Sequence, residues 1–174
     1  MEYSKRDIEI LFNRLNEELA RRSITGEVYV VGGAVMCLVF DARASTRDID
    51  AFFRPAREVR EAAQAVATAA GLQGDWLNDA VKTYLSAHED FQPYLELSNL
   101  HVLTASPEYL LAMKCLAMRL GEGFHDEDDV RFLLRILNLT DYQKALEVVT
   151  RYYPRERFPQ KTLYALEELL EPQD

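Results

Sequence analysis

Cysteine is scarce in this 174-residue chain. The two cysteines, Cys37 and Cys115, fall in apolar stretches that we expect to be helical. Two isolated thiols argue against a disulfide framework and against a zinc site, and buried, reduced side chains are the simpler interpretation. Such cysteine usage fits the reducing cytoplasm.

Long hydrophobic runs are also lacking. No apolar segment approaches the roughly 20 residues that span a bilayer. The first residues, Met1 to Asp7, lead into an amphipathic helix rather than into a signal peptide. We therefore expect a cytoplasmic protein without a membrane partner.

Positive charge is in the minority: 20 Lys and Arg stand against 29 Asp and Glu, and the formal net charge is −9. Proteins that grip a nucleic-acid backbone generally show a basic patch, so this balance argues against extended DNA binding. A small contact with nucleic acid stays open, because five arginines lie close together in the sequence: Arg43, Arg47, Arg54, Arg57 and Arg60.

What the chain does contain is a glycine pair, Gly32-Gly33, followed fifteen residues later by the carboxylate pair Asp48 and Asp50. The segment from Asp48 to Phe53 is expected to be a strand, and side chains two apart on a strand project to the same side. Two carboxylates that close repel each other unless a cation lies between them. Magnesium, which takes carboxylate and phosphate oxygens, is the natural candidate, with manganese as the alternative.

The glycine pair fits the same chemistry. An apolar strand precedes it, and the apolar stretch from Ala34 to about Asp41 is expected to be a helix. Glycine lets the backbone approach a ligand closely, and a helix N-terminus favours an anion. Taken alone, a tight turn at the glycines and a solvated edge strand at the aspartates would explain the same residues without any function.

The order of strand, Gly-Gly, short helix and Thr46-Arg47-Asp48-Ile49-Asp50 resembles the nucleotidyltransferase superfamily that includes DNA polymerase beta and the minimal nucleotidyltransferases. A weaker likeness, from Ser106 to Lys114, points to a bacterial subgroup in which some members are toxins of toxin-antitoxin systems. The resemblance implies that Gly32 and Gly33 contact the triphosphate, typically of ATP or another nucleotide, and that Asp48 and Asp50 hold the metal.

The superfamily also implies a third carboxylate on a later strand. Glu96 is the candidate, because the sequence from Tyr94 to Ser98 alternates like a strand. A solvated outer face would explain Glu96 equally well. Glu89 and Asp90 lie in an apparent polar loop and are poorer candidates.

Two basic residues are candidates for phosphate binding. Arg47 lies beside the first aspartate and can contact phosphate through two nitrogens. Lys114 lies in an apolar helix and can either reach phosphate, as the family likeness favours, or extend its stem along the surface with the ammonium in water. The acidic run after His125 is interpreted as the first turn of a helix, with Asp126 as N-cap and Asp129 three residues further on. A minor role of Asp129 close to the substrate stays open.

The hydrophobic pattern predicts an α+β fold: a nucleotidyltransferase-like small mixed sheet flanked by helices over residues 1–105, and a helical C-terminal part over residues 106–174, packed as one compact unit. Ser4 and Asp7 are expected to cap the first helix. A helix should follow Pro55 and end at Gly71, and the segment from Asp75 to Leu85, which contains the only tryptophan, should be a short helix.

Our hypothesis from the sequence is a magnesium-dependent nucleotidyltransferase that moves a nucleoside monophosphate from a nucleoside triphosphate to an acceptor hydroxyl. The acceptor is an RNA end such as that of tRNA, a protein or a small molecule, and the sequence does not choose among them. The resemblance adds a cognate antitoxin as a partner. The alternative is a non-catalytic interaction module, or an antitoxin-like partner, that retains the fold.

Overall fold

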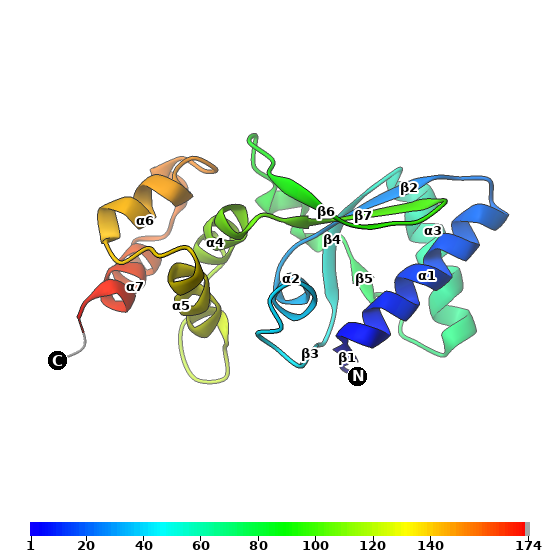
Figure 1. Cartoon of the computed structure of the whole chain (residues 1–174), viewed down its shortest axis with the longest axis horizontal. Coiled ribbons are helices and arrows are strands. Elements are labelled where there is room, and N and C mark those ends of the chain that lie inside the picture. The colour runs from blue at the N-terminus through cyan, green and yellow to red at the C-terminus, as the bar shows by residue number, and fades with distance from the viewer. Residues whose placement is uncertain (173–174) are drawn as a thin grey trace. The chain divides into compact units, whose positions relative to one another are not determined.

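The computed structural model describes residues 1–172 and divides the chain into two compact units (Figure 1). The first unit comprises residues 1–83 and 91–105, and the second comprises residues 84–90 and the chain from Ser106 onward. The segment 84–90 therefore belongs with the helical unit. Gln173 and Asp174, with which the predicted helical part ends, lie outside the described residues.

A five-stranded mixed sheet forms the centre of the first unit. In spatial order the strands are β5 (Leu77–Asn78), β4 (Ile49–Arg54), β2 (Gly26–Val30), β7 (Leu100–Ala105) and β6 (Phe91–Glu96). β2 runs antiparallel to β4 and parallel to β7, and β6 runs antiparallel to β7. The end of β2 and the beginning of β4 therefore meet at the same end of the sheet.

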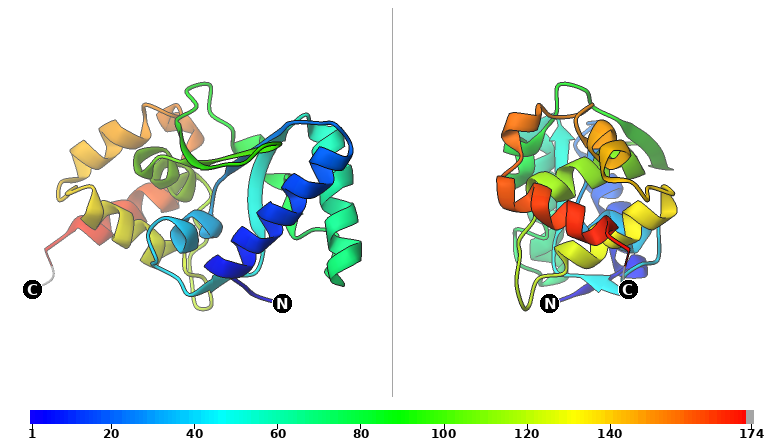
Figure 2. Two further views of the ribbon diagram at one scale, coloured as in Figure 1. Left: turned by 45° about the vertical axis from the view of Figure 1, so that its right-hand side comes forward. Right: turned by 90° about the vertical axis from the view of Figure 1, so that its left-hand side faces the viewer.

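Two long helices, α1 (Lys5–Arg21) and α3 (Ala56–Ala70), lie side by side on one face of this sheet (Figures 1 and 2). A Cβ built on Gly26 would lie 3.0 Å from a methyl of Val59 on α3 and 3.1 Å from a methyl of Leu19 on α1. Because side chains alternate along a strand, β2 turns Val28 and Val30 toward these helices as well.

The ends of both helices are set by local sequence, as expected. Ser4 and Asp7 form a capping box, in which the Asp7 amide donates to Ser4 Oγ (3.2 Å) and the Ser4 amide donates to Asp7 Oδ2 (2.8 Å). Pro55 precedes α3, and Gly71 ends it with a left-handed φ of +67°. Just before α1, β1 (Tyr3–Ser4) pairs with β3 (Ser45–Thr46).

The segment after α3 differs from the predicted short helix. It forms β5 and then a 3-10 helix, η1 (Ala80–Tyr84). Trp76 lies just before β5, is buried, and donates from its Nε1 to the carbonyl oxygen of Ala63 at 3.0 Å. Packing of the indole against α3 and pairing of β5 with β4 outweigh the local helical pattern.

The second unit is helical. α4 (Pro107–Leu116) is buried over most of its residues, including Cys115, whereas the helices that follow it are amphipathic and bury one apolar face. Cys37, in the first unit, is buried as well, so both expected buried thiols are confirmed. Among the described residues, no helix has the length and apolar character needed to cross a membrane. The helices are α4 (Pro107–Leu116), α5 (Asp126–Ile136), α6 (Tyr142–Val149) and α7 (Gln160–Leu170), with a 3-10 turn η2 (Arg155–Arg157).

Hydrogen bonds connect residues 84–90 to the helices of this unit. The Ser86 amide donates to the hydroxyl oxygen of Tyr109 at 2.9 Å. Asp90 Oδ2 accepts from Ser106 Oγ (2.7 Å) and from the Tyr152 hydroxyl (2.8 Å). Burial, together with the bond to Asp90, raises the pKa of Tyr152 to about 12. A mixed sheet with flanking helices, followed by a helical part, confirms the predicted α+β fold class.

Candidate active site

The glycine pair and the second aspartate meet where β2 ends. The amide of Val31 donates to the carbonyl oxygen of Asp50 at 2.9 Å. Gly32 then adopts φ +68° and ψ −150°, a conformation essentially reserved for glycine. A Cβ on Gly32 would lie 3.3 Å from Asp50 Oδ2. Glycine is thus required here twice, for the backbone turn and for the carboxylate that lies against its α-carbon.

The two aspartates occupy the beginning of β4. Asp50 is the second residue of the strand and is half-buried, whereas Asp48 precedes the strand and is exposed. The hydroxyl of Thr46 donates to the carbonyl oxygen of Asp48 at 3.1 Å and so fixes the approach to the strand. That both carboxylates project to the same side stays a prediction, because Asp48 lies outside the strand in which side chains alternate.

The negative charge of Asp48 acts on the hydroxyl group of Tyr3. Burial raises the pKa of Tyr3, and the negative charges of Asp75 and Asp48 raise it further. The carboxylates of Asp75 and Asp48 thus both lie near the Tyr3 hydroxyl.

Arg43 lies at the glycine turn, which the sequence did not predict. A Cβ on Gly33 would lie 2.9 Å from Arg43 Nη1 and 3.3 Å from Thr46 Oγ1. The guanidinium thus reaches the backbone of the second glycine. Nothing in the sequence distinguishes Arg43 from the other clustered arginines, because it is the loop between α2 (Gly33–Leu38) and β3 that brings its side chain back to the turn.

Arg47, the predicted phosphate ligand, points elsewhere. Its side chain is 87% exposed, and its Nε lies 3.9 Å from Glu2 Oε1. The structure therefore brings Gly32, Gly33 and Asp50 together with Arg43, while the role of Arg47 in nucleotide binding stays a prediction.

The helix after the glycines, α2 (Gly33–Leu38), is shorter than expected. It ends before Asp41, which has a positive φ of 50°. Six residues give only a small helix dipole, so the groups that can attract an anion to this turn are the glycine backbone and the guanidinium of Arg43 rather than the helix.

The structure does not bring Glu96 to the aspartates. Glu96 pairs with His101 at the beginning of β7, which lies level with Glu27 and Arg54 at the opposite end of the sheet. Arg54, which is level with Glu96, lies four residues, about 13 Å, from Asp50 along β4. In addition, β6 is three strand spacings, about 14 Å, from β4 across the sheet. Alternation in the sequence identified the strand but could not give its register.

The described residues contain no group of three Asp, Glu, His or Cys side chains placed to hold one metal ion. The carboxylate of Asp90 is hydrogen-bonded to Ser106 and Tyr152 within the second unit. On β6, the side chain that shares the face and the end of the sheet with Asp50 is Phe91. The predicted oxygen donors that the first unit places at this end of the sheet are the pair Asp48 and Asp50.

Lys114 belongs to the second unit, where two carboxylates surround its ammonium. Its Nζ lies 2.7 Å from Asp129 Oδ2 and 3.8 Å from Asp126 Oδ1, and the three side chains are between 5% and 11% exposed. Of the two alternatives for Lys114, the one in which its stem runs along the surface and its ammonium lies in water is thus wrong. Lys114 is a buried, paired cation.

Asp126 also differs from its predicted role. His125 is the N-cap of α5, and Asp126, the first helical residue, accepts from the Arg119 side chain (2.9 Å) and from the Arg119 amide (3.0 Å). Burial would raise the pKa of Asp126, but these hydrogen bonds and the charges of Lys114 and Arg119 outweigh it and hold the pKa below its ordinary value. The acidic run supplies buried partners for cations instead of an N-cap.

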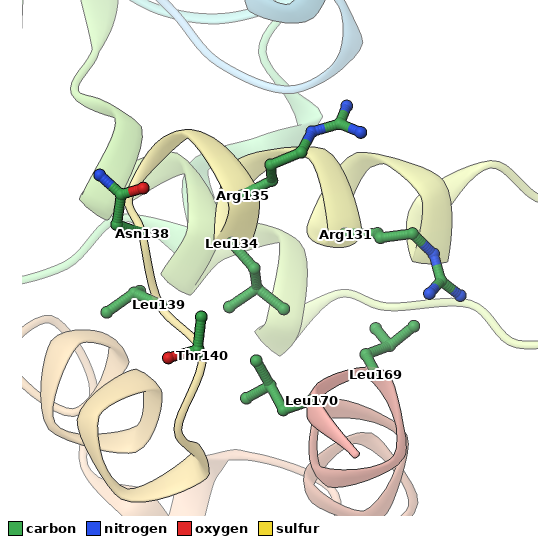
Figure 3. Close-up of a pocket in the computed structure, with 8 residues that line it drawn as sticks. All are labelled: Arg131, Leu134, Arg135, Asn138, Leu139, Thr140, Leu169 and Leu170. Carbon is green, nitrogen blue, oxygen red and sulfur yellow. The ribbon is translucent and has the colours of Figure 1, made fainter. Parts of the chain in front are cut away.

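The second unit also contains a pocket of about 350 Å³ between α5 and the end of α7 (Figure 3). None of the predicted site residues lines it. Its floor is apolar, and Arg131 and Arg135 extend from α5 at its rim. The lining residues are Arg131, Leu134, Arg135, Asn138, Leu139, Thr140, Leu169 and Leu170.

Comparison with known proteins identifies the sheet and most of the helical unit as parts of one family. Residues 6–155 match the model of a family described as "Nucleotidyltransferase of unknown function (DUF6036)". No curated protein and no solved structure gives a significant match.

Proposed function

This chain belongs to the DUF6036 family of nucleotidyltransferases, and we propose that it transfers a nucleoside monophosphate from a nucleoside triphosphate to an acceptor hydroxyl. The observation that carries this proposal is the contact between Gly32 and the Asp50 carboxylate beside the Arg43 guanidinium. A magnesium-bound triphosphate requires three things at one place: a backbone turn without side chains, a pair of carboxylates for the metal, and a positively charged side chain for the phosphates.

The donor set fits magnesium, and also manganese. Magnesium in phosphoryl-transfer sites is commonly held by one or two carboxylates, with substrate phosphates and water completing its octahedron. Asp48 and Asp50 would hold the ion. When bound, the ion supplies neutralisation of the charge that develops on the phosphates.

The triphosphate is proposed to bind at the turn. Gly32 and Gly33 allow phosphate oxygens to approach the backbone, since neither carries a side chain. The guanidinium of Arg43 can contact two phosphate oxygens at once. Arg47, exposed beside Asp48, is a second candidate that would have to leave its contact with Glu2.

The transfer itself forms a bond between the acceptor oxygen and the α-phosphorus and breaks the bond from that phosphorus to the bridging oxygen, so that pyrophosphate leaves. The acceptor proton passes to solvent. Because Glu96 lies at the other end of the sheet, this chain's residues act by holding the triphosphate in line and by balancing charge, which supplies most of the catalysis in phosphoryl transfer.

The acceptor is proposed to be an RNA end or a protein hydroxyl, with a small molecule as the remaining option. The net charge of −9 disfavours a long nucleic-acid footprint but permits a contact limited to one end. A role as the toxin of a toxin-antitoxin pair, held in check by a cognate antitoxin, accords with transfer to such an acceptor.

The test is transfer of label. The purified chain is incubated with magnesium, each nucleoside triphosphate labelled at the α-phosphate, and total RNA or protein. We expect label in macromolecule with the wild type, and loss of at least about a hundredfold with Asp48→Asn or Asp50→Asn. Asp41→Asn is the matched control, because Asp41 is 78% exposed, lies in the same unit and has a positive φ that Asn tolerates.

A non-catalytic module is the second candidate, and one observation favours it: among the described residues no three Asp, Glu, His or Cys side chains are placed to hold one metal ion, whereas the superfamily usually has three carboxylates at its site. Such a module would bind a protein partner without affinity for nucleotide. Native mass spectrometry of the chain with its candidate partners, in the presence and absence of nucleotide, separates the two functions.

A further inference from the structure

Three aromatic side chains cluster on the sheet face that carries Asp50. Phe52 follows Asp50 by two residues on β4, so both project to the same face. Tyr29 on β2 is the cross-strand partner of Phe52. The ring of Phe91 on β6 packs against both, with centroids 5.0 Å from Tyr29 and 6.3 Å from Phe52. We refer to Tyr29, Phe52 and Phe91 as the aromatic cluster.

The aromatic cluster is not part of the core beneath α1 and α3. Those helices cover the face to which Gly26, Val28 and Val30 project, and the residues between them on β2 project to the opposite face. Phe52 is 7% exposed, whereas Tyr29 and Phe91 are only half-buried. The cluster thus places aromatic surface on the same face as the carboxylate of Asp50.

Within the cluster, Phe91 is the ring best placed to stack on a ligand. The Arg54 guanidinium lies 5.2 Å from the centre of the Tyr29 ring and covers it. Phe52 is enclosed. Phe91 meets its two neighbours at 69° and 81°, so neither Tyr29 nor Phe52 stacks face to face on the Phe91 ring.

We propose that the aromatic cluster binds the nucleobase of the nucleoside triphosphate, with Phe91 as the stacking ring. This inference rests on the proposed function, which puts the α-phosphate at Asp48 and Asp50. One ribose separates that phosphate from the base. Phe52 lies two residues, about 7 Å, from Asp50 along the strand, and although Phe91 is on β6, its ring centre lies 6.3 Å from that of Phe52. Aromatic rings bind bases through their flat faces, and they do so with little preference among bases.

The test compares two ligands, ATP and inorganic tripolyphosphate, each with magnesium, by calorimetry. Tripolyphosphate presents the phosphates without a base. We expect Phe91→Leu, which keeps an apolar side chain, to weaken ATP binding at least about fivefold and to leave tripolyphosphate binding unchanged. Phe91→Trp keeps a stacking ring and should bind ATP as tightly as the wild type.

The same tryptophan variant gives a second readout should Phe91→Leu fold poorly. ATP should change the fluorescence of the indole introduced at this position, and tripolyphosphate should not. Unchanged ATP affinity in a folded Phe91→Leu protein, or equal losses for both ligands, overturns the nucleobase site alone. If the wild type binds neither ligand, the proposed function fails as well.

Discussion

The carboxylate of Asp50 lies against the α-carbon of Gly32, so closely that a single added carbon would stand 3.3 Å from Oδ2. Gly32 follows the end of β2 and Asp50 lies on β4, and the amide of Val31, the residue before Gly32, donates to the Asp50 carbonyl oxygen. Sequence motifs that lie fifteen residues apart thus form one surface. Changes to either residue should act on the other.

Gly32→Ala should lower both stability and transfer. The backbone conformation at Gly32 costs a side-chain-bearing residue of order 1–3 kcal/mol, and the new methyl would displace the Asp50 carboxylate. Urea denaturation measures the first effect, and label transfer measures the second. Gly71→Ala is the control: its φ is also positive, at +67°, but a Cβ there meets nothing within 4 Å. It should cost stability and leave transfer unchanged, so a similar loss of transfer in both variants would contradict the role of the contact.

Glu96→Gln should retain transfer activity within about twofold of wild type, because Glu96 lies at the end of the sheet away from Asp50. The initial rate of label transfer decides the point. A loss comparable to that of Asp50→Asn would restore Glu96 as the third carboxylate and would show that the strand register described above is not the active one.

Lys114→Met should destabilise the protein by roughly 3–5 kcal/mol, because Asp129 and Asp126 would lose a buried counter-charge. Adding Asp129→Leu removes one of the two carboxylates that Lys114→Met leaves without a counter-charge, and should restore much of the lost free energy of unfolding. Denaturant titration of the two single variants and the double variant gives the coupling between the residues.

The same double variant separates structure from function at Lys114. If the lysine also contacts phosphate, as the family likeness implies, a double variant of restored stability should still transfer label poorly. Full transfer by that variant would assign Lys114 a purely structural role.

Stability should fall in acid in a way that depends on Asp126. Its pKa is lowered in the folded chain, because hydrogen bonds from Arg119 and nearby positive charges outweigh the effect of burial. The stabilisation is therefore complete above the ordinary aspartate pKa of about 3.9 and is lost as pH falls toward the lower folded value. Thermal unfolding between pH 6 and pH 3 should show a steeper decline for wild type than for Asp126→Asn, and parallel curves would contradict this account.

Local patterns in the sequence were enough for most of the elements. Apolar spacing, the capping box of Ser4 and Asp7, and the Pro55 and Gly71 boundaries predicted α1 and α3 because those features act within one or two turns. The segment with Trp76 was predicted wrongly, since burial of its indole against α3 depends on packing that no local pattern encodes.

For the candidate site, the sequence predicted the residues that belong to a short motif. It did not predict the positions of residues that are set by the path of a loop or by the pairing register of a strand. Gly32 and Asp50 were identified from a short motif. Arg43 reaches the turn only through the path of its loop, and Glu96 lies far from the aspartates because β6 runs antiparallel to β7. Lys114 was singled out, but its two carboxylate partners follow from helix packing in the second unit.

Transfer of a nucleoside monophosphate by the surface that Gly32, Asp48 and Asp50 form is tested most directly with two labels. The wild-type chain and Asp50→Asn are incubated with the same nucleoside triphosphate labelled either at the α-phosphate or at the γ-phosphate, and label is followed into acceptor and into pyrophosphate. We expect the wild type to incorporate only the α-label and to release the γ-label as pyrophosphate, and Asp50→Asn to do neither. If the γ-label is incorporated, or if Asp50→Asn still transfers the α-label, this surface is not a nucleotidyltransferase site.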